Sequence, residues 1–316
     1  MFSTGSLSSV FPEGGRLIKE YERNPMQILI IIGIVLVCML LIIAVVSMIE
    51  NRKLSVSHYC ISSEKLPEEF DGSRILILAD LHNAEFGENN ERLIAKVNEE
   101  KPDYILLAGD MLVGHPGQST EIAAALICSL AERYPVYYGL GNHEERVKQD
   151  TEQYGTMWES YLRKLKDTVV LLENEKTELR RGQAVIPVYG LELGLDYYQR
   201  FHRKALSPEI MNQMIGRPDE TKFNIMIAHT PEYFKDYAAW GADLIVSGHL
   251  HGGMVRIPGL GGAISPRVRI FPKYDRGRYE EGNSTMLLSG GLGNHTLKIR
   301  VNNIPEIMVV ELKRKG

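Results

Sequence analysis

The stretch A-D-L-I-V-S-G-H-L-H-G-G, residues 242–253, decides how the rest of the chain is interpreted. Its first half is an apolar run typical of a buried strand, and its second half places two histidines one residue apart among glycines. Two imidazoles at a strand end are well suited to binding a metal ion, because histidine is the commonest metal ligand in proteins. Whether they do so depends on the ligands that other strands bring to the same place.

Similar apolar runs alternate with helical patterns along the chain. The periodicity predicts helices over 91–101, 121–133 and about 155–166. Buried strands are predicted at 74–80, 103–110, 136–140, 223–228, 242–247, 285–289 and 306–312. Strands that alternate with helices indicate an α/β fold, with a largely parallel sheet covered on both faces.

Polar side chains that can bind metal follow five of these predicted strands. Ligand sites in open α/β sheets lie just beyond the carboxyl ends of the strands, so these side chains should meet at one rim. They are Asp80, His82, Asp110, Asn142, His143, Glu144, His229, His249 and His251. One histidine at a strand end is more often a hydrogen-bonded structural residue, but so many at one rim are not expected by chance. The pairs 80/82 and 249/251 would each point to one side if the chain there stays extended.

The types of side chain limit the metal. Carboxylate, imidazole and amide ligands without thiolate are typical of catalytic Mn²⁺, Fe or Zn²⁺ rather than of a structural zinc site. The three cysteines, Cys38, Cys60 and Cys128, are too scattered to form such a site or a disulfide framework. The set is too large for one ion and suits two divalent ions, Mn²⁺ by preference, that share a bridging carboxylate. Such a centre attracts phosphate and acidifies bound water.

In chain order, the blocks D-L-H, G-D, G-N-H-E, an isolated His and G-H-L-H resemble the five-block signature of the calcineurin-like metallophosphoesterases. The resemblance extends from about residue 73 to the C-terminus, and the blocks are jointly very specific. Three further patterns are similar to the membrane-associated YkuE/YaeI-like branch: D-L-H-N-x-E-F-G-x-x-N, F-P-K-Y-x-x-G-x-Y and N-x-P-E-I. The resemblance implies a four-layer αββα sandwich, in which two mixed β-sheets are flanked by helices.

The resemblance also implies a role for each residue of the rim. It implies two metal-binding groups that share one bridge: Asp80, His82 and His251 on one ion, Asn142, His229 and His249 on the other, and the catalytic Asp110 between them. His143 is then the histidine that hydrogen-bonds the phosphoryl oxygen and protonates the leaving group, with Asn142 also in contact with the substrate. Glu144 would orient His143. A hydroxide that bridges the metals would attack phosphorus.

Two features of the C-terminal part concern the substrate. A late turn in this branch is expected to read S-R-G-L-G, whereas residues 289–293 read S-G-G-L-G, so an arginine that could help to hold the substrate is missing. Lys273 and Arg276, interleaved with aromatic residues, could form a lid that contacts the substrate phosphate. The alternative for Lys273 and Arg276 is a solvated loop with ordinary surface charge.

A long apolar run near the N-terminus predicts a membrane anchor. Residues 28–46 hold no charged or strongly polar side chain, and 19 residues of helix span roughly 28 Å, which matches a hydrocarbon core of about 30 Å. The run is longer than the apolar part of a signal peptide, and it lacks the polar face of a buried soluble helix. We therefore predict a tail at 1–25, a transmembrane helix at 26–49, a stalk at 50–72 and a phosphoesterase domain at 73–316.

Charge bears on location and on partners. Lys and Arg are balanced on the two sides of the span, and the short tail before it favours a single-pass protein of the cell membrane with an extracytoplasmic domain. A net charge of −4 leaves no strongly basic face, so no nucleic-acid partner is expected.

The predicted function is hydrolysis of a phosphodiester or pyrophosphate, either a small molecule or one linked to a lipid or a sugar nucleotide. Histidine as an acid matters most for a poor leaving group, which favours diesters over monoesters with good leaving groups. A phosphomonoesterase, a nucleotide phosphodiesterase and a non-catalytic metal-binding scaffold are the alternatives. The scaffold is the weakest of them, because every ligand position is filled.

Overall fold

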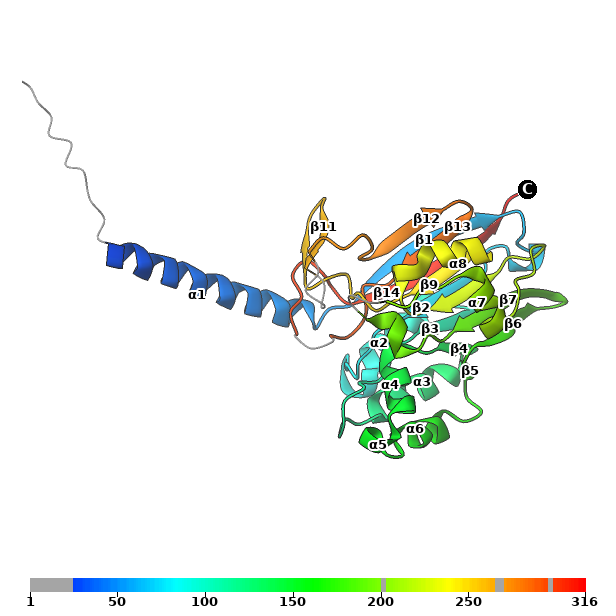
Figure 1. The fold of residues 1–316 in the computed structure, drawn as a ribbon, viewed down its shortest axis with the longest axis horizontal. Helices are drawn as coiled ribbons and strands as arrows, with labels where there is room; N and C mark the ends of the chain where they lie inside the picture. Colours follow the sequence, from blue (N-terminus) through cyan, green and yellow to red (C-terminus); the bar gives the residue numbers. More distant parts are fainter. Residues whose placement is uncertain (1–24, 200–202, 265–269, 295–297) are drawn as a thin grey trace, which may run out of the picture. The chain divides into compact units, whose positions relative to one another are not determined.

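The computed structural model describes residues 25–199, 203–264, 270–294 and 298–316 of the chain. Contacts between residues divide the chain into two units, Met1–Ile42 and Ile43–Gly316. The described part of the first unit belongs to helix α1 (Pro25–Glu50; Figure 1). Most of the apolar side chains of α1 are exposed. Within the described residues, α1 is the one helix long and apolar enough to cross a membrane, judged by length and composition. The predicted tail lies, up to residue 24, outside these residues.

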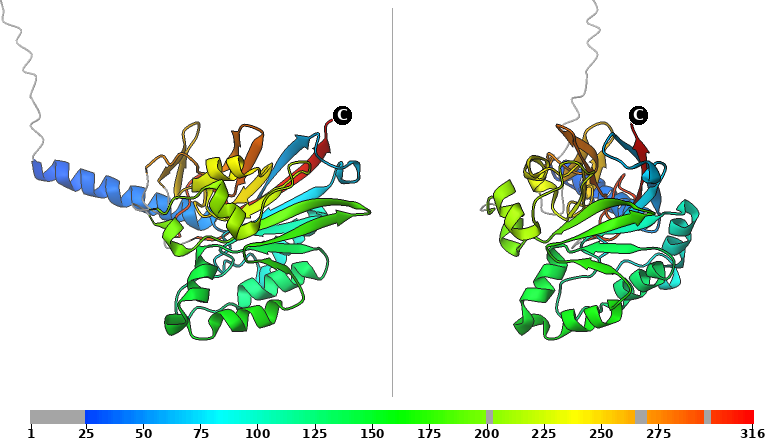
Figure 2. Two further views of the ribbon diagram at one scale, coloured as in Figure 1. Left: turned by 45° about the vertical axis from the view of Figure 1, so that its right-hand side comes forward. Right: turned by 90° about the vertical axis from the view of Figure 1, so that its right-hand side faces the viewer.

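The second unit is built on two six-stranded sheets (Figures 1 and 2). The first has the order β1-β14-β2-β3-β4-β5, formed in that order by Ser55–Ser63, Glu306–Arg314, Arg74–Leu78, Tyr104–Ala108, Val136–Gly139 and Val170–Leu172. The second has the order β12-β13-β9-β8-β7-β6, formed by Gly277–Glu281, Ser284–Leu288, Leu244–Ser247, Ile225–Ala228, Ala184–Leu191 and Glu175–Arg181. Each sheet has a run of four parallel strands and at least one antiparallel pairing, so both are mixed.

Side chains alternate between the two faces of each sheet, and this alternation builds four layers. In β2, Ile77 packs between the sheets with Ile225 of β8, whereas Leu76 faces the helices outside the first sheet. That outer face is covered by α2 (Glu91–Glu100), α3 (Glu121–Ala131) and α6 (Met157–Leu165). The outer face of the second sheet is covered by α7 (Pro208–Ile215) and α8 (Phe234–Trp240). The predicted αββα sandwich is confirmed.

The remaining described elements are short. Helices α4 (Asn142–Gln149) and α5 (Thr151–Tyr154) precede α6, and a separate two-stranded sheet is formed by β10 (Val255–Ile257) and β11 (Gly261–Ile264). Four 3₁₀ helices, η1 to η4, are formed by Glu68–Phe70, Glu88–Asn90, Leu195–Tyr198 and Pro231–Tyr233.

Residues 50–72 differ from the stalk that the sequence predicted. Strand β1 lies within them and pairs in parallel with β14 over its whole length, from Ser55 opposite Glu306 to Ser63 opposite Arg314. The pairing is not apparent from the pattern S-V-S-H-Y-C-I-S-S, because β1 is at the edge of the sheet and only Ile61 in it is buried. The sandwich therefore begins before residue 73.

Candidate metal centre

The side chains predicted to bind metal meet at the carboxyl ends of the parallel strands. Asp80 and Asp110 follow β2 and β3 of the first sheet, whereas His229 and His249 follow β8 and β9 of the second. Asn142 comes from the first turn of α4, a helix that the sequence analysis did not predict because all its residues except Val147 are polar or charged. The predicted ligands and His143 are all buried: Asp80, His82, Asp110, Asn142, His143, His229, His249 and His251.

The sequence analysis assumed an extended backbone at the pairs 80/82 and 249/251. The structure shows a different conformation. Five predicted ligands are in the left-handed region, with φ from 45° to 75°: Asp80, His82, Asp110, His249 and His251. This conformation costs a residue other than glycine of order 1–3 kcal/mol, and it persists only where the surrounding structure enforces it. Asp80 and His82 do lie together, with Nε2 of His82 3.9 Å from Oδ1 of Asp80, but not by way of an extended chain, whereas His249 and His251 belong to different groups.

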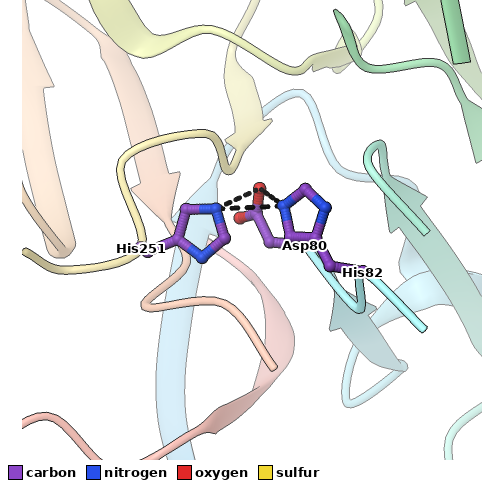
Figure 3. A group of neighbouring side chains, drawn as sticks. All are labelled: Asp80, His82 and His251. Atoms are coloured by element: carbon purple, nitrogen blue, oxygen red, sulfur yellow. Dashed lines mark hydrogen bonds and ion pairs between the residues drawn. The ribbon is translucent and has the colours of Figure 1, made fainter. Parts of the chain in front are cut away.

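Asp80, His82 and His251 form one group that could hold a metal ion (Figure 3). The Nε2 atoms of the two histidines are 3.1 Å apart, and the Nε2 atom of His251 is 3.5 Å from Oδ1 of Asp80. The Nδ1 atom of His251 lies 3.1 Å from the carbonyl oxygen of Gly293. A bond there would leave Nε2 directed at the centre of the group, as in metal sites where a second hydrogen bond orients the ligand.

Asp110, His229 and His249 form a second group of the same kind. The Oδ2 atom of Asp110 is 3.0 Å from Nε2 of His229 and 3.7 Å from Nε2 of His82, a member of the first group. Asp110 thus lies close to members of both groups. The two groups suggest a dinuclear site for divalent ions, as the sequence analysis predicted; the metal itself is not identified by them.

Asn142 tests whether the second group fits a metal ion. Its Oδ1 atom is buried and has no hydrogen-bond partner in the structure. A buried amide oxygen without a partner costs free energy, about 1–3 kcal/mol, unless something accepts its lone pairs. A divalent cation beside Asp110 and His229 would do so, and the donor set therefore fits the implied metal.

Burial and charge act in opposite directions on the ionisable groups of the centre. Burial raises the pKa of Asp80 to about 7, against the opposing effect of the neighbouring His229, which lowers that pKa. Burial alone would lower the pKa of His229, but the carboxylates of Asp110 and Asp80 outweigh it and raise that pKa to about 9. Protons are thus held tightly between the carboxylates and the imidazoles, and a divalent cation can take over this neutralising role.

His143 has a defined tautomer. The backbone N–H of Gly114 donates to its Nδ1 atom at 2.8 Å, so the proton of the neutral ring is on Nε2. That atom is 4.0 Å from Oδ2 of Asp110 and faces the centre. The carboxylate of Glu144 accepts from the backbone amides of Asp110 and Met111, at 2.8 and 2.7 Å. We therefore expect Glu144 to orient His143 through the loop that follows Asp110.

Two glycines of the motifs provide space rather than an unusual backbone conformation. A Cβ atom on Gly141 would lie 2.2 Å from Oδ1 of Asp110, and one on Gly248 would lie 2.5 Å from Oδ2 of Asp80. Neither glycine has a positive φ. The glycines therefore allow chain segments from the two sheets to approach both carboxylates closely.

Arg300 is a buried residue of this region that the sequence analysis missed. Its side chain donates to the backbone carbonyl groups of Gly290, Gly291, Gly293 and Asn303, at 2.6 to 3.1 Å. It thus holds the 289–293 turn, whose Gly293 carbonyl contacts His251. No pattern in the sequence marks it, because its partners are backbone atoms.

Arg276 lies beside the same turn, and Lys273 is three residues before Arg276 in the chain. Arg276 forms an ion pair with Glu306 at 2.9 Å and donates to Oδ1 of Asn303. A Cβ atom on Gly290 would come within 3.1 Å of its Cδ atom, so the glycine that departs from the family pattern makes room for Arg276. The ammonium group of Lys273 lies 4.7 Å from the centre of the Tyr274 ring. Substrate contact by either residue stays a prediction.

Comparisons with known proteins agree with this geometry. The family model of the calcineurin-like phosphoesterases matches residues 73–253. The metallophosphoesterase YkuE of Bacillus subtilis is 26% identical over 272 residues, which cover 84% of this chain and 87% of that protein. The phosphodiesterase YaeI of Escherichia coli is 26% identical over 245 residues, 76% of this chain and 82% of its own. The UDP-2,3-diacylglucosamine pyrophosphatase LpxG of Chlamydia muridarum is 24% identical over 287 residues, which cover 78% of this chain and 86% of that protein.

Proposed function

We propose, on the premise that this chain belongs to the calcineurin-like phosphoesterase family, that it cleaves phosphodiesters or pyrophosphates at a membrane surface. Metal-dependent hydrolysis of phosphoesters is its reaction class, given the family domain and relatives named as a phosphodiesterase and a pyrophosphatase. The position of Asp110 is the observation that best supports cleavage of phosphodiesters or pyrophosphates. Its carboxylate lies within 4.0 Å of Nε2 of His82, His143 and His229, so metal ligands and a proton donor surround one point.

We assign two divalent cations, Mn²⁺ by preference, to this centre. Their ligands would be Asp80, His82 and His251 for one, Asn142, His229 and His249 for the other, and Asp110 for both. When bound, such a pair supplies an acidified water and the positive charge that phosphoryl transfer requires. The protein's own contribution is to bury the carboxylates and to hold the imidazoles within a few ångströms of one another.

His143 would act as the acid. Its Nε2–H faces the centre, and the Gly114 amide keeps Nδ1 from carrying the proton. A neutral imidazole with this tautomer can donate a hydrogen bond to a phosphoryl oxygen and pass its proton to the departing oxygen. The gain is largest for an alkoxide or phosphate leaving group, which supports diesters and pyrophosphates as the substrate class.

Helix α1 supports a substrate at the membrane. We propose that residues 26–49 anchor the chain in the cell membrane by a single span, with the hydrolase unit on the extracytoplasmic side. LpxG is named as a pyrophosphatase of UDP-2,3-diacylglucosamine, a lipid-linked sugar nucleotide. A lipid- or sugar-nucleotide-linked pyrophosphate is therefore our preferred substrate for this chain. Protease protection in intact cells would check the side: digestion of the hydrolase unit from outside is expected, and full protection would place it inside.

The reaction is tested with the purified full-length chain and Mn²⁺ on nucleotides, glycerophosphodiesters, lipid pyrophosphates and phosphomonoesters. Diesters or pyrophosphates should be cleaved fastest. His143→Ala should lower that rate by about 10²–10⁴-fold, the usual contribution of a general acid, without loss of bound metal. His58→Ala is the matched control, because His58 is an exposed histidine of β1. Unchanged turnover by His143→Ala would exclude the role proposed for it.

The same measurements separate the alternatives. Faster cleavage of monoesters would identify a phosphomonoesterase, whereas metal binding without turnover of any ester would identify a scaffold.

A further inference from the structure

Exposed apolar side chains are unevenly distributed over the described part of the second unit. Outside α1, five large apolar side chains are exposed there: Val170, Ile257, Leu260, Ile270 and Phe271. Four of the five lie between residues 257 and 271, with exposures from 39% for Ile257 to 72% for Ile270. Exposed apolar side chains that gather in one place are typical of an interaction surface.

These four side chains lie on or beside the hairpin of strands β10 and β11. Ile257 is opposite Gly261 in the hairpin, and Leu260 is in the turn between the strands. Ile270 pairs with Ile264 as an isolated bridge, and the backbone N–H of Phe271 donates to Ala263. We call this element, residues 255–264 with 270 and 271, the apolar hairpin. It belongs to neither six-stranded sheet.

The apolar hairpin is tied to the last turn of α1 through residues 301–303. The backbone N–H of Arg256 donates to Val301 at 2.9 Å, and the side-chain amide of Asn302 donates to Arg256. The backbone N–H groups of Asn302 and Asn303 donate to the carboxylate of Glu50, at 3.0 and 2.9 Å. Glu50 is the last residue of α1, and these residues all belong to the second unit.

This link places the hairpin close to the bilayer if α1 spans it. Glu50 follows the apolar run by four residues, which is about 6 Å of helix, so its carboxylate would lie at the level of the lipid headgroups. Transfer of side chains such as Leu260 and Phe271 from water into that layer is favourable, by about 25 cal/mol for each Å² of apolar surface buried. An exposed lysine nearby, Lys273, suits the anionic headgroups.

The hairpin is also adjacent to the metal centre. Strand β10 begins four residues after His251, and the side-chain amide of Asn303 donates to the carbonyl groups of His251 and Gly253. The same 301–303 segment therefore touches the helix end, the hairpin and the loop of a metal-binding histidine.

We propose that the apolar hairpin inserts into the lipid surface beside the anchor and so presents the metal centre to phosphoesters held in the bilayer. The occupant of the patch is the lipid bilayer. This inference rests on the proposed anchor and refines the proposed substrate class to lipid-borne phosphoesters.

Fluorescence quenching tests the contact directly. The two native tryptophans, Trp158 and Trp240, are buried, so lipid-borne quenchers should affect their emission little. The full chain with Leu260→Trp is reconstituted in vesicles of brominated phosphatidylcholine and in vesicles of the unbrominated lipid. Emission from the introduced indole should fall at least twofold in brominated vesicles.

Val170→Trp is the matched control, because Val170 is exposed on β5, at the opposite edge of the first sheet from β1. It should show no such decrease. Equal emission of Leu260→Trp in both kinds of vesicle would overturn the proposal. Hydrolysis of soluble bis-p-nitrophenyl phosphate by the same preparations separates the two ideas: if that activity is missing while quenching occurs, the proposed reaction fails and the lipid contact stands.

Discussion

Arg300 lies outside every metal-binding block, yet its buried guanidinium holds the turn that contacts His251. We expect Arg300→Met to leave several buried carbonyl groups without a donor, each costing about 1–3 kcal/mol. The free energy of unfolding should fall by at least about 3 kcal/mol. The affinity for one Mn²⁺ should also fall by about 10–100-fold, as for other residues that orient a metal ligand.

Denaturant unfolding and metal titration of the purified variant would measure the two effects. Arg278→Met is the control, since Arg278 is exposed and contacts one backbone carbonyl, that of Cys60. If Arg300→Met bound both ions as tightly as the unchanged chain, Arg300 would have no part in positioning His251.

At the scale of single elements, α4 contributes a second buried acid, next to Glu144 in the chain. Glu145 is 5% exposed, and burial together with the neighbouring Glu192 raises its pKa from 4.5 to about 8. Between those pH values the folded protein keeps a proton that the unfolded chain has released, so the stability contributed by this group falls as pH rises.

Glu145→Gln should remove this pH dependence. We expect the variant to exceed the unchanged chain in free energy of unfolding by about 1 kcal/mol or more at pH 9, and to differ little from it at pH 4.5. Denaturant unfolding at several pH values checks this, with Glu152→Gln on the exposed part of α5 as control. An advantage of Glu145→Gln that does not grow with pH would contradict the assignment.

Strand β1 yields a prediction about where the chain can be shortened. A chain of residues 54–316 keeps β1 and its pairing with nine residues of β14, whereas a chain of residues 65–316 keeps β14 but lacks β1. We expect the longer fragment to unfold cooperatively and the shorter one to be markedly less stable or to aggregate, because β14 then becomes an open edge with a buried apolar row. Circular dichroism during heating would compare them; equal midpoints would mean that 50–72 is a stalk after all.

At the scale of the whole molecule, the metal centre joins the two sheets. Asp80 and Asp110 come from the first sheet, and His229 and His249 from the second, so a bound cation would link the halves of the sandwich. A ligand that binds only the folded state stabilises it by mass action. We therefore expect chelation of the metal to lower the thermal midpoint and added Mn²⁺ to restore it.

Asp110→Asn provides the control for this prediction. It removes the carboxylate that lies close to both groups, so its midpoint should respond much more weakly to chelator and to Mn²⁺ than that of the unchanged chain. A midpoint of the unchanged chain that ignores both chelator and Mn²⁺ would contradict a metal centre between the sheets.

Local patterns in the sequence were sufficient to predict much of the fold and most residues of the metal centre. Apolar runs that end in Asp, His or Asn predicted which side chains would gather at the rim, because the direction of a parallel strand places its carboxyl end. They also predicted the apolar anchor and, with the family resemblance, the layered sandwich. These features depend on residues close together in the chain, where period and spacing express the physics directly.

Only the tertiary structure decided the rest. The left-handed backbone at Asp80 and His249 is held by a contact between residues 169 apart in the chain, in which the amide of His249 donates to the Asp80 carboxylate. Strand β1 is a strand because β14 pairs with it from the other end of the sequence, and Arg300 matters because a distant turn offers it carbonyl groups. Each depends on long-range pairing, which no local period of the sequence records.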